Sequence, residues 1–252
     1  MRTIRFIAAC AVVLLAGSVP AAAQNRSSQP APTAPYKPVA IVLPQPMTDA
    51  SFEAMRKQLG EAAQRKDRAA MAPLVVAQGF FWDRDGRNAA DKRKFGFANL
   101  SAALGLANKE GAGWDILTGY AEDPTASPSP THTGAICAPA DPAFDAKAFA
   151  ELIKTTNTDA TEWGYPVSPG LEVHATAQAT GPVIDKLGLH FVRIVPETAS
   201  EQPSYMRIAT PSGKSGYVSI DSIAPIGNDQ ICYVKEGGAW KIGGYIGGGE
   251  PQ

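Results

Sequence analysis

The apolar positions of residues 48–160 repeat at the spacing of amphipathic helices. Four helices are predicted, with buried faces at Phe52, Met55, Leu59 and Ala63; at Ala70, Met71, Leu74 and Val75; at Phe97, Leu100 and Leu104; and at Phe144, Ala148, Phe149, Leu152 and Ile153. Asp67, Asp91 and Asp141 are placed to cap the last three helices, and Pro73 should shorten or kink the second. Residues 48–163 are therefore predicted to form a mostly helical domain, with a short buried strand or turn at residues 79–82.

After residue 163 the pattern changes to that of short strands. The predicted strands are rich in β-branched and aromatic residues and are separated by Gly or Pro: Leu171–Ala175, Val183–Leu187, Phe191–Val195, Tyr205–Thr210 and Gly216–Val218. A tight turn is predicted at Pro211–Lys214, because Pro fixes φ and Gly relieves the strained position. Gln230–Val234 and Trp240–Ile246 are predicted to pair as a terminal hairpin. The fold class predicted from both halves is α+β.

The strand region ends in the stretch Gly213-Lys214-Ser215-Gly216-Tyr217-Val218. With the order of the preceding strands, this stretch resembles a bacterial SH3-like domain over residues 165–226, although His174 stands where Arg is commoner in that family. The resemblance implies a small β-barrel at residues 164–226 that is used for binding, followed by a terminal hairpin at residues 227–252. Such barrels bind through their open ends and loops, since side chains fill the interior.

The first 23 residues have the architecture of a secretion signal. Arg2 and Arg5 precede the short apolar run Phe6–Ala16, and Ala21-Ala22-Ala23 offers a small-residue cleavage site. A lipoprotein box ending at Cys10 is the less favoured alternative. We expect the mature chain to begin at Gln24, to be periplasmic or secreted, and to have no stable membrane insertion. Residues 24–47 are predicted to be a Pro-rich linker, with an extended or disordered chain.

Removal of the signal changes the charge and the cysteine count. The formal charge moves from −1 to −3, because two Arg and no acidic residue are lost, and this balance argues against a nucleic-acid partner. Cys137 and Cys232 remain, and an oxidising compartment favours a disulfide between them over a reactive thiol. We expect this bond to tie the helical region to the terminal hairpin and to clamp it to the barrel.

The sequence offers no catalytic constellation. His132, His174 and His190 lack metal-ligand spacing, and no phosphate-binding glycine loop or nucleophile elbow occurs. No catalytic residue, cofactor or metal is therefore predicted. The four Trp residues could stack on sugar rings if exposed, but burial in the core is the favoured interpretation.

The candidate ligand surface consists of Tyr205, Arg207, Lys214 and Tyr217, which could present aromatic faces beside positive charge to an acidic sugar or a peptide carboxylate. The alternative is that both tyrosines only pack in the barrel wall. The expected function is a non-catalytic periplasmic protein whose barrel binds a component of the cell envelope, either peptidoglycan or a protein partner. Two further hypotheses stay open: a cell-wall hydrolase targeted by the barrel, and a structural barrel with the binding surface on the helical region.

Overall fold

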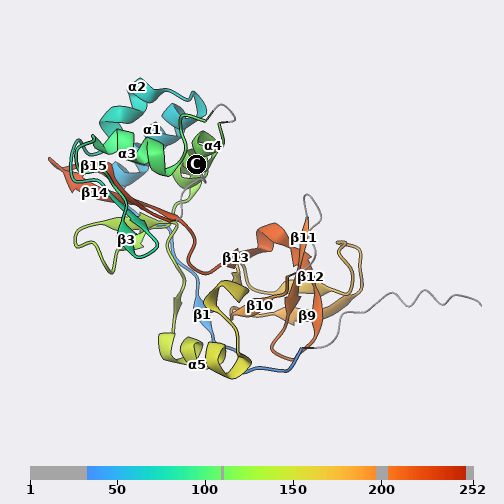
Figure 1. The fold of residues 1–252 in the computed structure, drawn as a ribbon. Helices are drawn as coiled ribbons and strands as arrows, with labels where there is room; N and C mark the ends of the chain where they lie inside the picture. The colour runs from blue at the N-terminus through green and yellow to red at the C-terminus, as the bar shows by residue number, and fades with distance from the viewer. Residues whose placement is uncertain (1–32, 109–110, 197–203, 248–252) are drawn as a thin grey trace, which may run out of the picture. The chain divides into compact units, whose positions relative to one another are not determined.

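The structure is a computed structural model that describes residues 33–108, 111–196 and 204–247. The predicted signal peptide and residues 24–32 of the predicted linker lie outside the described residues. Within the described ranges the chain has five α-helices and sheets of two, seven and six strands (Figure 1). The predicted α+β class is confirmed.

The six-stranded sheet combines strands from both ends of the chain. Across the sheet the order is β3 (Arg87–Asn88), β2 (Phe81–Arg84), β15 (Ala239–Ile246), β14 (Gln230–Glu236), β5 (Ile136–Ala138) and β4 (Ser127–Pro128). Neighbours are antiparallel except β15 and β2, which are parallel. The predicted terminal hairpin thus exists as β14–β15, and it forms the middle of a sheet whose other strands come from residues 81–138.

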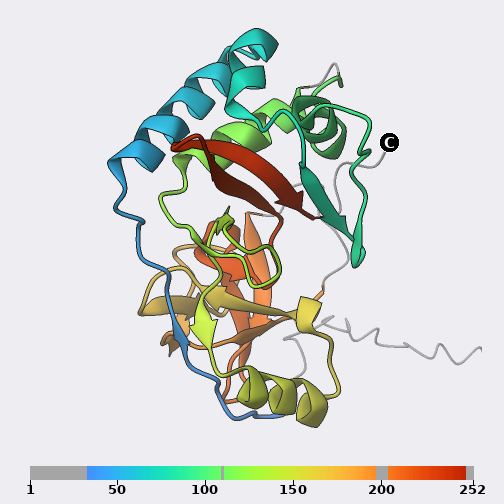
Figure 2. The same cartoon turned by 90° about the vertical axis from the view of Figure 1, so that its left-hand side faces the viewer.

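Four helices cover one face of this sheet (Figure 2). They are α1 (Ala50–Gln64), α2 (Arg68–Met71), α3 (Gly96–Ala103) and α4 (Ala112–Glu122), and the 3-10 turn η1 (Ala72–Leu74) follows α2. Asp49 caps α1 by accepting hydrogen bonds from the N–H groups of Ser51 and Phe52, and the predicted cap Asp67 does the same for α2. Alternation along β14 turns Tyr233 toward the helices and Cys232 toward the opposite face.

Two predicted helix starts need correction, and helix α4 was not predicted. Helix α4 begins after Gly111, whose φ is 79° and which has no side chain to signal a cap. Helix α3 begins after Phe95, because the carboxylate of Asp91 bonds Arg93 within its own loop. Helix α5 (Ala146–Thr156) begins at Asp145 and not at Asp141, because residues 143–144 form strand β6.

The seven-stranded sheet is antiparallel throughout. Its order is β13 (Ile223–Pro225), β7 (Trp163–Pro166), β10 (Val192–Ile194), β11 (Tyr205–Ala209), β12 (Ser215–Ser219), β8 (Leu171–His174) and β9 (Val183–Leu187), with 3-10 turns η2 (Ala160–Glu162) and η3 (Ile220–Ser222) between strands. All five strands predicted for this region are present, and Gly213 sits in the predicted turn with φ 82°. Over the described residues the sheet is open, with β13 and β9 at its edges, so the closed barrel predicted for residues 164–226 is not confirmed.

The described part of the Pro-rich segment is extended, as predicted, but it is packed and not a free tether. Strand β1 (Ile41–Val42) pairs with β6 (Ala143–Phe144), and the Val39 and Ile41 side chains are buried. The Tyr36 hydroxyl donates to the Ala209 carbonyl at 2.9 Å, and its ring meets the Trp163 ring edge-on. The apolar residues between the prolines therefore stabilise the strand region and helix α5.

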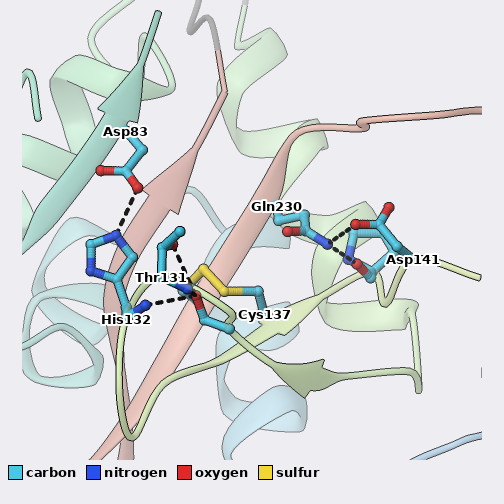
Figure 3. Close-up of a disulfide and its surroundings, with 9 residues drawn as sticks. Asp83, Thr131, His132, Cys137, Asp141 and Gln230 are labelled. Carbon is cyan, nitrogen blue, oxygen red and sulfur yellow. Dashed lines mark hydrogen bonds and ion pairs between the residues drawn. A yellow bond between two sulfur atoms is a disulfide. The ribbon is translucent and has the colours of Figure 1, made fainter. Parts of the chain in front are cut away.

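The disulfide lies within the six-stranded sheet (Figure 3). Cys137 of β5 and Cys232 of β14 are opposite each other in the register of the two strands, with Cα atoms 4.0 Å apart. The predicted pairing is confirmed. The bond does not clamp the helical region to residues 164–226 as expected, because both cysteines belong to the six-stranded sheet. All seven strands of the other sheet lie in the chain between them.

Candidate functional site

The candidate ligand surface lies on one face of the β11–β12 hairpin. Arg207 and Tyr217 are directly opposite in the register of the two strands, and Tyr205 is two residues before Arg207. Residues at this spacing share a face, so Tyr205, Arg207 and Tyr217 lie together, and all three are half-buried. The next residue along each strand, Ile208 after Arg207 and Val218 after Tyr217, is fully buried in the core on the other face.

The backbone pairing adds a fourth side chain that the sequence did not indicate. His174 of β8 is opposite Tyr217, and it is half-buried like its neighbours. Its Nδ1 donates to the Gly181 carbonyl at 2.9 Å, and the Arg207 Nε donates to the Ser215 hydroxyl at 3.0 Å. These bonds fix an imidazole and a guanidinium beside the two phenol rings.

Lys214 does not join this face. Its ammonium group donates to the Ile184 carbonyl at 2.9 Å and lies 3.9 Å from the Asp185 carboxylate. The turn that carries Lys214 therefore directs its charge toward β9. Of the four predicted residues, the structure brings together Tyr205, Arg207 and Tyr217.

A carboxylate–imidazole pair lies on the far side of the six-stranded sheet from the helices (Figure 3). The His132 Nε2 donates to Asp83 at 2.7 Å, and the imidazole stacks on the Phe81 ring with centroids 3.6 Å apart. Phe81 in turn packs with both cysteines of the disulfide. No sequence pattern indicated this pair, because its members are 49 residues apart and come from a strand and a distant loop.

This pair orients an imidazole, but among the described residues no hydroxyl or thiol is hydrogen-bonded to the His132 ring. Ser129 of the same loop accepts a hydrogen bond from the His132 backbone N–H. A nucleophilic mechanism needs the base within hydrogen-bond reach of the attacking group. Over residues 33–108, 111–196 and 204–247 no three His, Cys, Asp or Glu side chains are grouped so that they could hold a metal ion.

The four tryptophans are buried, so stacking on sugar rings is not available to them. Trp82, Trp114, Trp163 and Trp240 are each exposed by 9 % or less. Trp240 donates its indole N–H to Asp49 at 3.2 Å, with the Lys235 ammonium 4.7 Å from the ring centroid. Hydrogen bonds from Ser51 and Phe52, with smaller contributions from Trp240 and Lys235, hold the pKa of Asp49 well below its usual range. The Trp240 region is thus a structural contact between helix α1 and the hairpin.

A chain of buried tyrosines lies inside the helix-covered core. Tyr245 donates to Asp229 at 2.5 Å, and burial raises the pKa of the neighbouring Tyr120 to about 12. The Tyr233 hydroxyl is buried without a hydrogen-bond partner among the described residues. Burial raises the pKa of Tyr233 far above its usual range, so this hydroxyl stays protonated. The side chains of Tyr120, Tyr233 and Tyr245 belong to the helix-covered core.

Comparisons with known proteins identify no relative from which a function could be inferred. None of the described helices has the length and apolar character needed to span a bilayer. No protein-family model, no curated protein and no solved structure matches this chain.

Proposed function

We propose that this protein is a non-catalytic binding protein of the bacterial cell envelope, and that the strand region at residues 164–226 is an SH3-like binding module. Its ligand surface is the face that carries Tyr205, Arg207 and Tyr217, with His174 at its edge. The ligand is a component of the envelope with sugar rings or peptide carboxylates, of which peptidoglycan has both.

One observation carries this proposal: two half-buried phenol rings flank a guanidinium on the same face of paired strands. Phenol rings of this kind supply flat apolar area with a polar edge, which suits the faces of sugar rings. A guanidinium recognises carboxylates through paired N–H donors. Because the opposite face of the same strands is the buried core, the backbone under this surface is rigid.

The disulfide supports the location. Disulfides persist in oxidising compartments such as the periplasm and the exterior of the cell. Cys137 and Cys232 are both almost completely buried, so the bond is a permanent part of the core. The expected secretion signal at residues 1–23 is consistent with export.

The test is co-sedimentation of the exported protein with purified, protein-free peptidoglycan. We expect binding that Tyr205→Ala together with Tyr217→Ala weakens at least about tenfold, since a well-packed aromatic contact contributes on the order of 1–3 kcal/mol. Lys214→Gln is the matched control on the same hairpin, because the Lys214 side chain is directed to β9. Soluble muropeptides should not accumulate during the assay.

Unchanged binding by the folded tyrosine variant would refute the assigned surface. Release of soluble fragments by the purified protein would refute the non-catalytic function. Failure of the unaltered protein to sediment with peptidoglycan would exclude that ligand, and binding should then be sought with soluble envelope proteins.

A further inference from the structure

A second surface with binding chemistry lies between β2 and α3. Residues 84–94 contain five basic and two acidic side chains. Both acids are paired within the segment: Asp85 with Arg84 at 3.7 Å, and Asp91 with Arg93 at 3.2 Å. In the described part of the chain, no hydrogen bond or ion pair engages the side chains of Arg87, Lys92 and Lys94, which are all exposed. The segment therefore has a net charge of +3 in a chain with a formal charge of −1.

This segment is held in one shape by a buried side chain of α3. Asn99 is 5 % exposed, and its amide accepts from the Asp91 N–H at 2.8 Å and donates to the Asp91 carbonyl at 3.1 Å. The same amide lies 3.4 Å from the Lys94 carbonyl. Because the backbone is fixed before any ligand arrives, binding here would lose little conformational entropy.

An apolar recess adjoins the basic segment. It has a volume of about 440 Å³, and its walls include Pro73, Val75, Phe95 and Phe97, with Lys241 as the charged residue among its lining. Phe95 is 67 % exposed, which is unusual for an aromatic residue in a folded domain. An exposed aromatic wall beside a recess is typical of a site that receives one side chain of a partner.

The charged side chains near the recess favour a negatively charged ligand. Lys94 directly precedes Phe95, and Lys92 and Lys94 line a neighbouring hollow together with Asn88 and Asn99. Arg68 lies 5.2 Å from the centroid of the Phe97 ring. Lys241 is neutralised by a hydrogen-bonded ion pair with Glu236. The charges with no paired partner around the recess are thus positive, and they complement carboxylates.

We propose that this surface, made of Arg87, Lys92, Lys94 and the recess walled by Phe95 and Phe97, docks an acidic peptide segment of a partner protein. One large apolar side chain of the segment enters the recess, and flanking Asp or Glu side chains meet the lysines. The recess beside the positive charges favours a peptide segment over a lipid surface, because a hollow of this kind receives a single side chain. This surface is separate from the Tyr205–Arg207–Tyr217 face and rests on different residues.

The experiment uses the full exported chain and fluorescent peptides of about ten residues. The probe has Asp and Glu on both sides of one Trp; a second peptide has Gly in place of Trp, and a third has Asn and Gln in place of the acids. Fluorescence anisotropy gives each dissociation constant. We expect binding of the first peptide only, with a loss of at least about fivefold in 0.5 M NaCl because salt screens exposed charge pairs.

Two variants test the two halves of the surface. Phe95→Ser should raise the dissociation constant of the Trp peptide at least about tenfold, as expected when a central apolar contact is removed. It should leave the fold intact, because Phe95 is the N-cap of α3 without a side-chain bond and Ser is a favoured N-cap. Lys92→Gln with Lys94→Gln should raise the dissociation constant of the Trp peptide about three- to tenfold and remove most of the salt dependence of binding. Lys147→Gln with Lys154→Gln, both exposed on α5, is the charge-matched control.

Three outcomes would overturn the proposal. The first is no binding of the Trp peptide at concentrations up to about 1 mM. The second is equal affinity for the Trp and Gly peptides, or for the protein and its Phe95→Ser variant. The third is sedimentation with vesicles of anionic phospholipid that depends on Lys92, Lys94 and Phe95 while the peptide does not bind, which would assign the surface to a membrane.

Discussion

Removal of the disulfide is the perturbation whose effect follows most directly from the structure. Cys137→Ala with Cys232→Ala deletes the bond, and Ala avoids the unpaired buried hydroxyl that Ser would leave. Both sulfurs are buried between Phe81 and Ala135 on the face of the sheet away from the helices. The variant therefore loses some packing as well as the covalent constraint.

The magnitude follows from the length of the loop that the bond closes. The cysteines are 95 residues apart, and loop-closure entropy for such a loop amounts to about 4–5 kcal/mol at 25 °C. This figure applies if the seven-stranded sheet unfolds together with the six-stranded one. If the seven strands stay folded, the free loop is much shorter and the loss should fall to about 3 kcal/mol or less, as for loops of about 15 residues.

The assay is urea unfolding followed by circular dichroism and by tryptophan fluorescence. The unaltered protein reduced with dithiothreitol is the control, because it keeps both sulfur atoms and isolates the covalent effect. We expect reduction to lower the free energy of unfolding by about 3–5 kcal/mol and the double variant to lower it slightly more. A loss below about 1 kcal/mol with an unchanged denaturant slope would refute the reasoning.

Three other predictions concern single residues. Burial lowers the pKa of His190 below its ordinary 6.5. The unfolded chain therefore binds the proton more tightly, and the free energy of unfolding should decrease as pH falls below about 6.5. Between pH 7.5 and 5 the urea midpoint of His190→Gln should change less than that of the unaltered protein. The pKa of Asp49 is low chiefly because the Ser51 hydroxyl donates a hydrogen bond to its carboxylate. The carboxylate therefore stabilises the fold above its ordinary pKa of 3.8, and this contribution is lost as pH falls below that value. At pH 7, Asp49→Ala should lower the melting temperature more than Asp49→Asn. A Cβ at Gly216 would lie 2.6 Å from the Val173 Cγ1, so Gly216→Ala should reduce the free energy of unfolding by about 1–3 kcal/mol, and a melting temperature equal to that of the unaltered protein would contradict this packing.

The elements that the sequence predicted well are those whose evidence is local. The strands at residues 171–218 alternate over a few residues and are bounded by Gly or Pro, so both their existence and the β11–β12 pairing could be expected. The disulfide pairing followed from a count, since only two cysteines remain after the predicted cleavage. The same local hairpin brings Tyr205, Arg207 and Tyr217 together, so three of the four candidate site residues share a face.

The features that the sequence did not reveal depend on contacts between distant segments. The parallel pairing of β15 with β2 joins residues more than 150 positions apart, such as Tyr245 and Trp82. No periodicity encodes such a partner, so the sequence predicted a hairpin that follows the strand region at residues 164–226 and did not reveal that it belongs to the first sheet. The recess at Phe95 was missed for the same reason, because its walls come from η1, α3 and β15, and the sequence shows only that an aromatic follows three basic residues.

The bond between β5 and β14 also makes the chain between the cysteines a covalent ring. A protease that cuts one peptide bond inside this ring opens it but releases no fragment, since both new ends remain attached through Cys137 and Cys232. The Tyr205–Arg207–Tyr217 face lies inside the ring, and the basic segment with its recess lies outside it. A single nick inside the ring would therefore leave the two surfaces on one molecule, and a second cut or loss of the disulfide would be needed to separate them.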